Sequence, residues 1–218
     1  MKREQQFIDI AIKELLNPEL EATKQYLEVC ELEYEEGQPK VSRVAINLEE
    51  QSADVYFAVK TARYYIVVHL TTDPEIKAYS VWVESGHLVY LTAVSNKLTF
   101  DELASFIRLA PLEGWSIGER KNFKNSANDF SRINYDPIKN EAYDLEEKLN
   151  LLLDELEKDI DGVVELTKNA YAYISVCKYQ YIDANAGISL DIQTISRLNK
   201  LNLGLDIDTY IVGNRVKE

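Results

Sequence analysis

Hydrophobic and polar positions change period several times along the chain, and each change marks a different kind of element. Residues 3–35 carry apolar side chains at helical spacing, and the pair Asn17-Pro18 interrupts them. Because proline lacks an amide proton and disfavours helical backbone in the residue before it, this pattern predicts two helices separated near residue 17. Gly37 begins a turn-forming stretch that ends the helical region.

Residues 41–95 alternate between apolar and polar side chains in short runs rich in valine, isoleucine and tyrosine. A period of two puts successive side chains on opposite faces of a strand, so this region predicts an antiparallel meander. The two-residue connection Ser85-Gly86 predicts a tight hairpin whose glycine has a positive φ angle and whose next residue, His87, is exposed. The five predicted strands are 41–48, 54–60, 63–70, 76–84 and 87–95.

Helices and strands alternate in the rest of the chain. Thr99 and Glu102 form a capping box ahead of an apolar run, so a helix begins there and ends before Pro111. The most regular pattern is a leucine-rich stripe that predicts a helix from Asp144 to about Lys168. The other predicted elements are a polar loop at 114–128, a strand at 129–135, a strand at 171–182, a helix at 190–201 and a strand at 203–212.

These elements predict an α+β fold in which a mixed, mainly antiparallel sheet carries helices on one face, in a ferredoxin-like arrangement. The N-terminal helical pair and the β-meander precede it. The chain forms either one domain or two; in the second case the boundary lies near Ser85 and divides residues 1–84 from residues 85–218.

The charge balance limits the partners that the chain can have. Its net charge of −13 repels phosphate backbones, so we expect no direct binding to nucleic acid and favour a basic protein partner. The alternative is that the acidic charge only keeps the protein soluble. Neither a signal-peptide segment nor a membrane span is apparent, so the expected location is the cytoplasm and no membrane contact is expected.

Residues that could carry chemistry are few. His69 lies inside an apolar strand, where a hydrogen-bonded structural histidine is expected rather than a catalytic base. Cys30 and Cys177 are expected to be buried free thiols in a reducing compartment. The spacing of histidines and cysteines fits no metal motif, and no glycine-rich phosphate loop is present. We therefore expect no catalytic residues, no metal and no cofactor, and favour a protein that is not an enzyme.

The last two predicted strands have one aliphatic face each. Their other faces carry tyrosine and aspartate side chains, and tyrosine is enriched at protein interfaces because it combines a rigid ring with a polar tip. This face is the candidate partner-binding surface; alternatively, it packs internally against the meander. The candidate residues are Tyr173, Tyr179, Asp206, Asp208 and Tyr210.

Three stretches of the C-terminal half form a recognisable series: residues 98–103 read LTFDEL, residues 115–119 read WSIGE and residues 201–210 read LNLGLDIDTY. With these motifs, about residues 87–213 resemble a bacterial family catalogued as domain of unknown function 4279. The resemblance implies the family's fold and a bacterial source, and it assigns no catalytic residue. The residues in front of it lie outside the usual family unit.

The favoured function is an acidic protein-binding module that masks a basic partner. Such a module could be an immunity protein that neutralises a cationic toxin, or an inhibitor of a nucleic-acid-handling or defence protein. The alternative from another class is a small-ligand or peptide sensor with an aromatic pocket between the two sheet regions, lined by Trp82, Trp115 and tyrosines.

Overall fold

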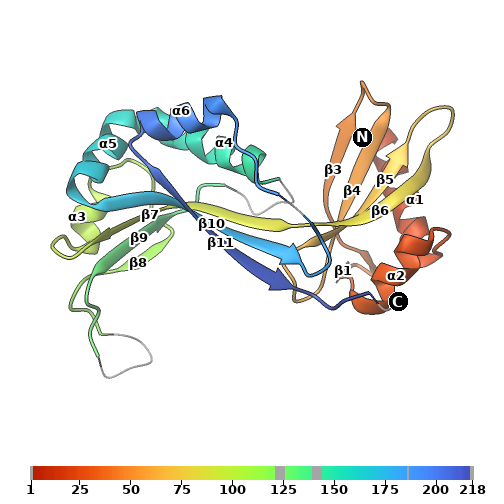
Figure 1. Cartoon of the computed structure of the whole chain (residues 1–218), viewed down its shortest axis with the longest axis horizontal. Helices are drawn as coiled ribbons and strands as arrows, with labels where there is room; N and C mark the ends of the chain where they lie inside the picture. Colours follow the sequence, from red (N-terminus) through yellow and green to blue (C-terminus); the bar gives the residue numbers. More distant parts are fainter. Residues whose placement is uncertain (1, 121–125, 139–143, 186, 217–218) are drawn as a thin grey trace. The chain divides into compact units, whose positions relative to one another are not determined.

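The computed structural model describes residues 2–120, 126–138, 144–185 and 187–216, which form two compact units. The first unit comprises Met1–His87, Lys178–Gly187 and Thr209–Glu218, and the second comprises Leu88–Cys177 and Ile188–Asp208. Helices occur together with mostly antiparallel sheets, which confirms the predicted α+β class (Figure 1).

The first unit is built on a four-stranded antiparallel sheet in the order β3-β4-β5-β6. The predicted helical pair is confirmed, since two helices precede this sheet. Between the helices and the sheet, a short hairpin turns through positive φ angles at Glu36 and Gly37. The elements are α1 Lys2–Leu16, α2 Glu21–Val29, β1 Tyr34–Glu35, β2 Gln38–Pro39, β3 Val41–Asn47, β4 Ser52–Ala58, β5 Tyr65–Thr71 and β6 Lys77–Glu84.

One face of this sheet packs against the helices. The apolar stripe of α1 is buried through Phe7, Ala11 and Leu15. It joins a cluster that includes Phe57 and Leu70, which are both fully buried. The alternation of the strand residues thus supplies one apolar face per strand, and burial of these faces holds the unit together.

The predicted hairpin at Ser85-Gly86 is wrong. The next strand, β7 (Gly86–Ser95), belongs to a different sheet from β6, so the two strands do not pair. Gly86 has no positive φ angle; instead, a Cβ atom there would lie 1.6 Å from the carbonyl oxygen of Arg63. The glycine therefore permits a close approach of two backbone segments. His87 is buried, with 8% of its surface exposed, so its predicted exposure is also wrong.

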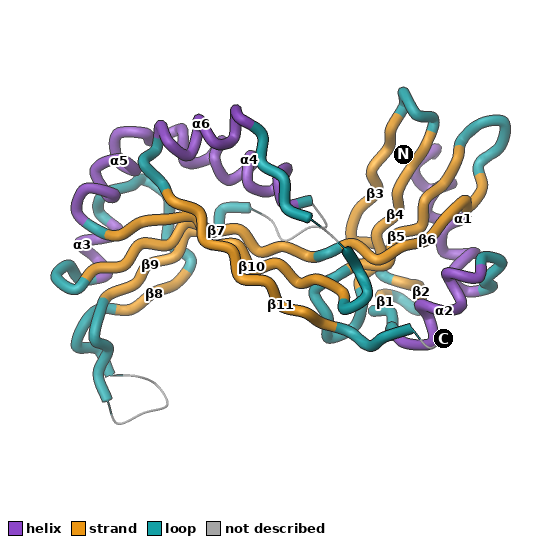
Figure 2. The backbone as a smooth tube through the Cα atoms, viewed as in Figure 1, coloured by secondary structure: helices purple, strands orange, loops and turns teal. Residues whose placement is uncertain are grey.

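The second unit contains most of a five-stranded sheet in the order β11-β10-β7-β9-β8. Helices α4, α5 and α6 lie together on one face of this sheet (Figure 2). Strands β10 and β11 contribute residues to both units. The elements are α3 Phe100–Ala104, β8 Glu113–Trp115, β9 Ser131–Tyr135, α4 Leu145–Leu156, a 3-10 turn Glu157–Asp159, α5 Ile160–Asn169, β10 Tyr171–Tyr181, α6 Ile192–Lys200 and β11 Gly204–Val212.

The helix predicted from Asp144 is confirmed, with an interruption by the 3-10 turn that separates α4 from α5. The Asp144 carboxylate caps α4 by accepting a hydrogen bond of 2.7 Å from the amide of Glu147. The leucine stripe is buried against the sheet and forms the centre of the core of this unit. Its members are Leu145, Leu149, Leu152, Leu153 and Leu156.

The capping box at Thr99 and Glu102 is also confirmed at the start of α3. Part of the predicted polar loop, residues 121–125, lies outside the described residues. In the described part of the chain, no helix is both long and apolar enough to cross a membrane.

Candidate functional site

The five predicted site residues lie on β10 and β11 but are divided between the two units. Tyr173, Asp206 and Asp208 belong to the second unit, and Tyr179 and Tyr210 belong to the first. The two aspartates are exposed, Tyr210 is 46% exposed, and the other two tyrosines are half-buried. None of the five is buried in a core.

In the second unit, the two aspartates lie on an edge strand. β11 is the outermost strand of the described sheet, and Leu205 and Ile207 pack toward the core on the face that carries the helices. Strand alternation therefore directs Asp206 and Asp208 to the opposite face. Neither carboxylate has a basic group within ion-pair distance in the part of the chain that the structure describes.

Two tyrosines of β10 lie on the same face as these aspartates. Tyr171 is 70% exposed, and its ring centroid is 5.0 Å from that of Tyr173. Gly204, at the start of β11, is close to Tyr173, because a Cβ atom there would lie 3.8 Å from the Cβ of the tyrosine. We call Tyr171, Tyr173, Asp206 and Asp208 the Tyr–Asp surface. It offers rigid aromatic area and two unpaired negative charges.

In the first unit, Tyr179 contacts Tyr210, which was also a predicted site residue, and Arg63, which was not. Its ring stacks on that of Tyr210, with centroids 5.2 Å apart and an angle of 16° between the planes. The guanidinium of Arg63 lies 5.2 Å from the centroid of the same ring and donates a hydrogen bond of 3.4 Å to the Tyr179 hydroxyl. Such a cation–π contact and hydrogen bond restrict the orientation of the arginine.

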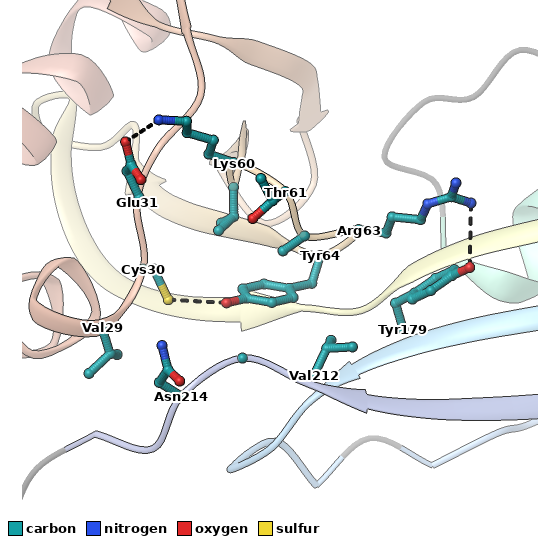
Figure 3. A pocket seen from close by; sticks show the side chains of 13 residues that line it. Val29, Cys30, Glu31, Lys60, Thr61, Arg63, Tyr64, Tyr179, Val212 and Asn214 are labelled. Atoms are coloured by element: carbon teal, nitrogen blue, oxygen red, sulfur yellow. Dashed lines mark hydrogen bonds and ion pairs between the residues drawn. The ribbon is translucent and has the colours of Figure 1, made fainter.

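Arg63 and Tyr179 line a pocket of about 520 Å³ in the first unit (Figure 3). The chain that follows α2 runs antiparallel to the end of the β4 segment, through a bridge between Leu32 and Val59. This pairing places Glu31 opposite Lys60, whose side chains form an ion pair of 2.6 Å. The apolar part of the lining consists of Val29, Val59, Ala62 and Val212.

Two neutral polar groups lie inside this pocket. The Tyr64 hydroxyl and the Cys30 thiol are 3.5 Å apart, and both residues are buried. Burial raises the pKa of the Tyr64 hydroxyl, and the hydrogen bond with Cys30 raises it further. Burial also raises the pKa of Cys30, so this thiol is protonated near neutral pH and is a poor nucleophile. The charged groups of the lining are therefore Glu31, Lys60 and Arg63.

Backbone conformation fixes the walls of the pocket. Thr61 has a φ angle of 59°, which is an outlier for a β-branched residue, and strained residues of this kind are frequent at ligand sites. On the opposite side, Gly213 has a φ angle of 87°. A Cβ atom there would lie 2.6 Å from the Tyr181 ring and 2.9 Å from the Tyr64 hydroxyl. The glycine thus lets the segment after β11 pass directly over these tyrosines.

The histidine predicted to be structural is hydrogen-bonded, as expected. His69 Nδ1 lies 2.7 Å from the Asp54 carboxylate on the neighbouring strand.

Cys30 is buried as predicted, whereas Cys177 is only partly buried, so that expectation was wrong for the second thiol. Among the described residues, no group of three or more histidine, cysteine, aspartate or glutamate side chains could hold a metal ion.

The pocket contains residues that the sequence did not single out. Lys60, Thr61 and Arg63 belong to a connection that we interpreted only as a turn between strands. Trp82 and Trp115, which were expected to line an aromatic pocket, do not line this one. Trp82 lies beside His69, and Trp115 packs against Phe130. The aromatic residues of the pocket are Tyr64 and Tyr179 instead.

Comparison with known proteins defines the class of this chain. The family model described as Domain of unknown function (DUF4279) matches residues 84–212, which is more than half of the chain. The chain therefore belongs to this family, as its motifs suggested. Searches of curated proteins and of solved structures returned no match.

Proposed function

We propose that this protein is a cytoplasmic, non-catalytic binding module that masks a basic protein partner. The observation that carries the proposal is the Tyr–Asp surface, on which Asp206 and Asp208 are exposed and have no ion-pair partner in the described chain. Carboxylates that are already exposed and unpaired can meet cations without first breaking internal pairs. They would steer a basic partner toward this face and select against acidic ones.

The aromatic neighbours support the same role. Tyr171 and Tyr173 supply contact area next to the carboxylates, and tyrosines often dominate the binding energy of protein interfaces. β11 is also an edge strand of the described sheet, and an extended partner segment can pair with such an edge. An immunity protein against a cationic toxin, or an inhibitor of a nucleic-acid-handling or defence protein, would use such a surface.

Affinity capture from the organism that carries the gene tests this proposal. The expected result is that the immobilised protein retains one predominant basic protein at low salt and releases it at high salt, because exposed charge pairs are screened. The Asp206→Lys/Asp208→Lys double variant should not retain it. The matched control is Glu49→Lys/Glu50→Lys, which makes the same charge change at two exposed positions of the first unit.

The control separates local recognition from bulk charge. If both double variants lose the basic protein equally, the net charge alone attracts it and the proposal is wrong. If neither variant loses it, the partner binds elsewhere on the molecule.

A further inference from the structure

The pocket of the first unit differs in charge from the molecule as a whole. The chain carries a net charge of −13, yet no acidic group lies within ion-pair distance of Arg63 in the described structure. Arg63 is exposed, and its hydrogen bond to Tyr179 uses only one nitrogen of the guanidinium. The remaining N–H groups are available to an acceptor from outside the chain, in the fork geometry that matches a carboxylate.

Charge pairing inside the lining determines the kind of anion that fits. Lys60 and Glu31 neutralise each other across 2.6 Å, so Arg63 alone sets the charge of the lining at +1. A single guanidinium balances a monoanion better than a dianion such as phosphate. The Cys30 thiol and the Tyr64 phenol are buried, hydrogen-bond to each other and add no charge to the lining.

The size and the remaining lining indicate the rest of the ligand. A volume of about 520 Å³ is in the usual range for small-molecule sites. Val29 and Val212, which are half-buried, supply apolar surface to the lining (Figure 3). The ligand body is therefore apolar over part of its length.

We propose that this pocket binds a small organic monocarboxylate with an apolar body, whose carboxylate is held by Arg63 and whose body lies against Val29 and Val212. Tyr179 acts as a positioning residue, because it orients the guanidinium through its hydroxyl and its ring. This site is independent of the Tyr–Asp surface, whose residues line no part of the pocket.

The test uses the full ¹⁵N-labelled chain and 3-phenylpropanoate as the probe, followed by NMR titration. We expect saturable shifts of the backbone amides at residues 60–64 and 213–214. The uncharged isostere 3-phenylpropanamide should bind about tenfold more weakly or worse, because it forfeits charge-assisted hydrogen bonds. Acetate, which lacks the apolar body, should also bind more weakly than the probe.

Three variants give the assay its specificity. Arg63→Gln should weaken binding of 3-phenylpropanoate about tenfold or more while its spectrum remains that of a folded protein. Arg108→Gln is the control, since Arg108 is an 88% exposed arginine of the second unit. It should leave binding unchanged. Asp206→Lys/Asp208→Lys should also leave binding unchanged, which separates this inference from the proposed protein-binding function.

The proposal is overturned if none of acetate, hexanoate and 3-phenylpropanoate produces saturable shifts at these amides. It is also overturned if Arg63→Gln binds the probe as tightly as the wild type, or if the amide isostere binds as well as the carboxylate. Tyr179→Phe, which keeps the ring and removes the hydroxyl, should weaken binding less than Arg63→Gln does. An equal loss in both variants would contradict the positioning role.

Discussion

The two units share a structural plan and differ in the sign of the unpaired charge at their candidate sites. Each packs helices on an apolar sheet face, and each draws residues from β10 and β11. In the pocket of the first unit, Glu31 and Lys60 form an ion pair, whereas the cation Arg63 has no acidic group within ion-pair distance in the described chain. In the second unit the unpaired charges of interest are the carboxylates Asp206 and Asp208.

Net charge is therefore a weak guide to a local site. Although the chain has a net charge of −13, the lining of the pocket with Arg63 has a positive charge. The Tyr–Asp surface, by contrast, is negative. Net charge describes attraction at long range, whereas the groups left unpaired after folding determine what binds at contact.

The largest effect is expected from core truncation in either unit. Leu152→Ala in the second unit and Leu70→Ala in the first should each lower the free energy of unfolding by about 2–5 kcal/mol, because both side chains are fully buried. Chemical denaturation measures this loss. Ile192→Ala, at a side chain that is 74% exposed, is the control and should change stability little. A near-neutral Leu152→Ala would show that the leucine stripe is not a core.

Gly213→Ala should be the next most damaging change, and its effect should be confined to the first unit. A methyl group there would overlap the Tyr181 ring and the Tyr64 hydroxyl, and φ is positive, so we expect a loss of about 1–3 kcal/mol. Gly187→Ala is the matched control, because a Cβ atom at Gly187 meets open space. Equal thermal stability of the two variants would contradict the close packing described for the pocket wall.

Each unit contains one cysteine, so thiol labelling compares them directly. Cys30 is 5% exposed and its pKa is raised by burial, whereas Cys177 is partly exposed. We expect iodoacetamide at neutral pH to modify Cys30 about tenfold more slowly than Cys177 or slower still, since the thiolate is the reactive form. The single-thiol variants Cys30→Ser and Cys177→Ser assign the two rates by mass spectrometry. Faster labelling of Cys30 would mean that the pocket floor opens readily.

A smaller contrast is expected between two buried tyrosines. The Tyr64 hydroxyl has Cys30 as a partner, so Tyr64→Phe should cost about 0.5–1.5 kcal/mol. The Tyr135 hydroxyl, in the second unit, is buried and has no partner in the described chain. Tyr135→Phe should therefore leave the free energy of unfolding unchanged or raise it, because it removes an unsatisfied polar group. Equal losses in both variants would show that Tyr135 also has a partner in solution.

Local patterns predicted the helices and strands well, because capping and periodicity depend only on residues that are close together in the sequence. The capping box at Thr99, the cap at Asp144 and the buried leucine stripe all follow from spacings of three or four positions. Pairing between strands is not local. Nothing in the period of the residues around Gly86 indicates that β7 joins a second sheet, because its neighbours there, β9 and β10, lie far along the chain.

The same distinction applies to the candidate sites. Strand alternation was enough to place Asp206 and Asp208 on the face away from the core. Arg63 could not be singled out, because its partner Tyr179 lies 116 positions further along the chain. A residue whose role depends on a contact with a distant part of the chain has no local sequence signature. The residues beside Arg63 in the sequence indicate only a turn.

In the function that we propose, the exposed carboxylates of the Tyr–Asp surface recognise a basic partner and contribute little to folding. Titration calorimetry of the captured and purified partner against the Asp206→Lys/Asp208→Lys variant tests this most directly. We expect loss of measurable binding with a melting temperature close to that of the wild type, because exposed charges contribute little to stability. Wild-type affinity in a folded double variant, or unfolding of that variant, would contradict it.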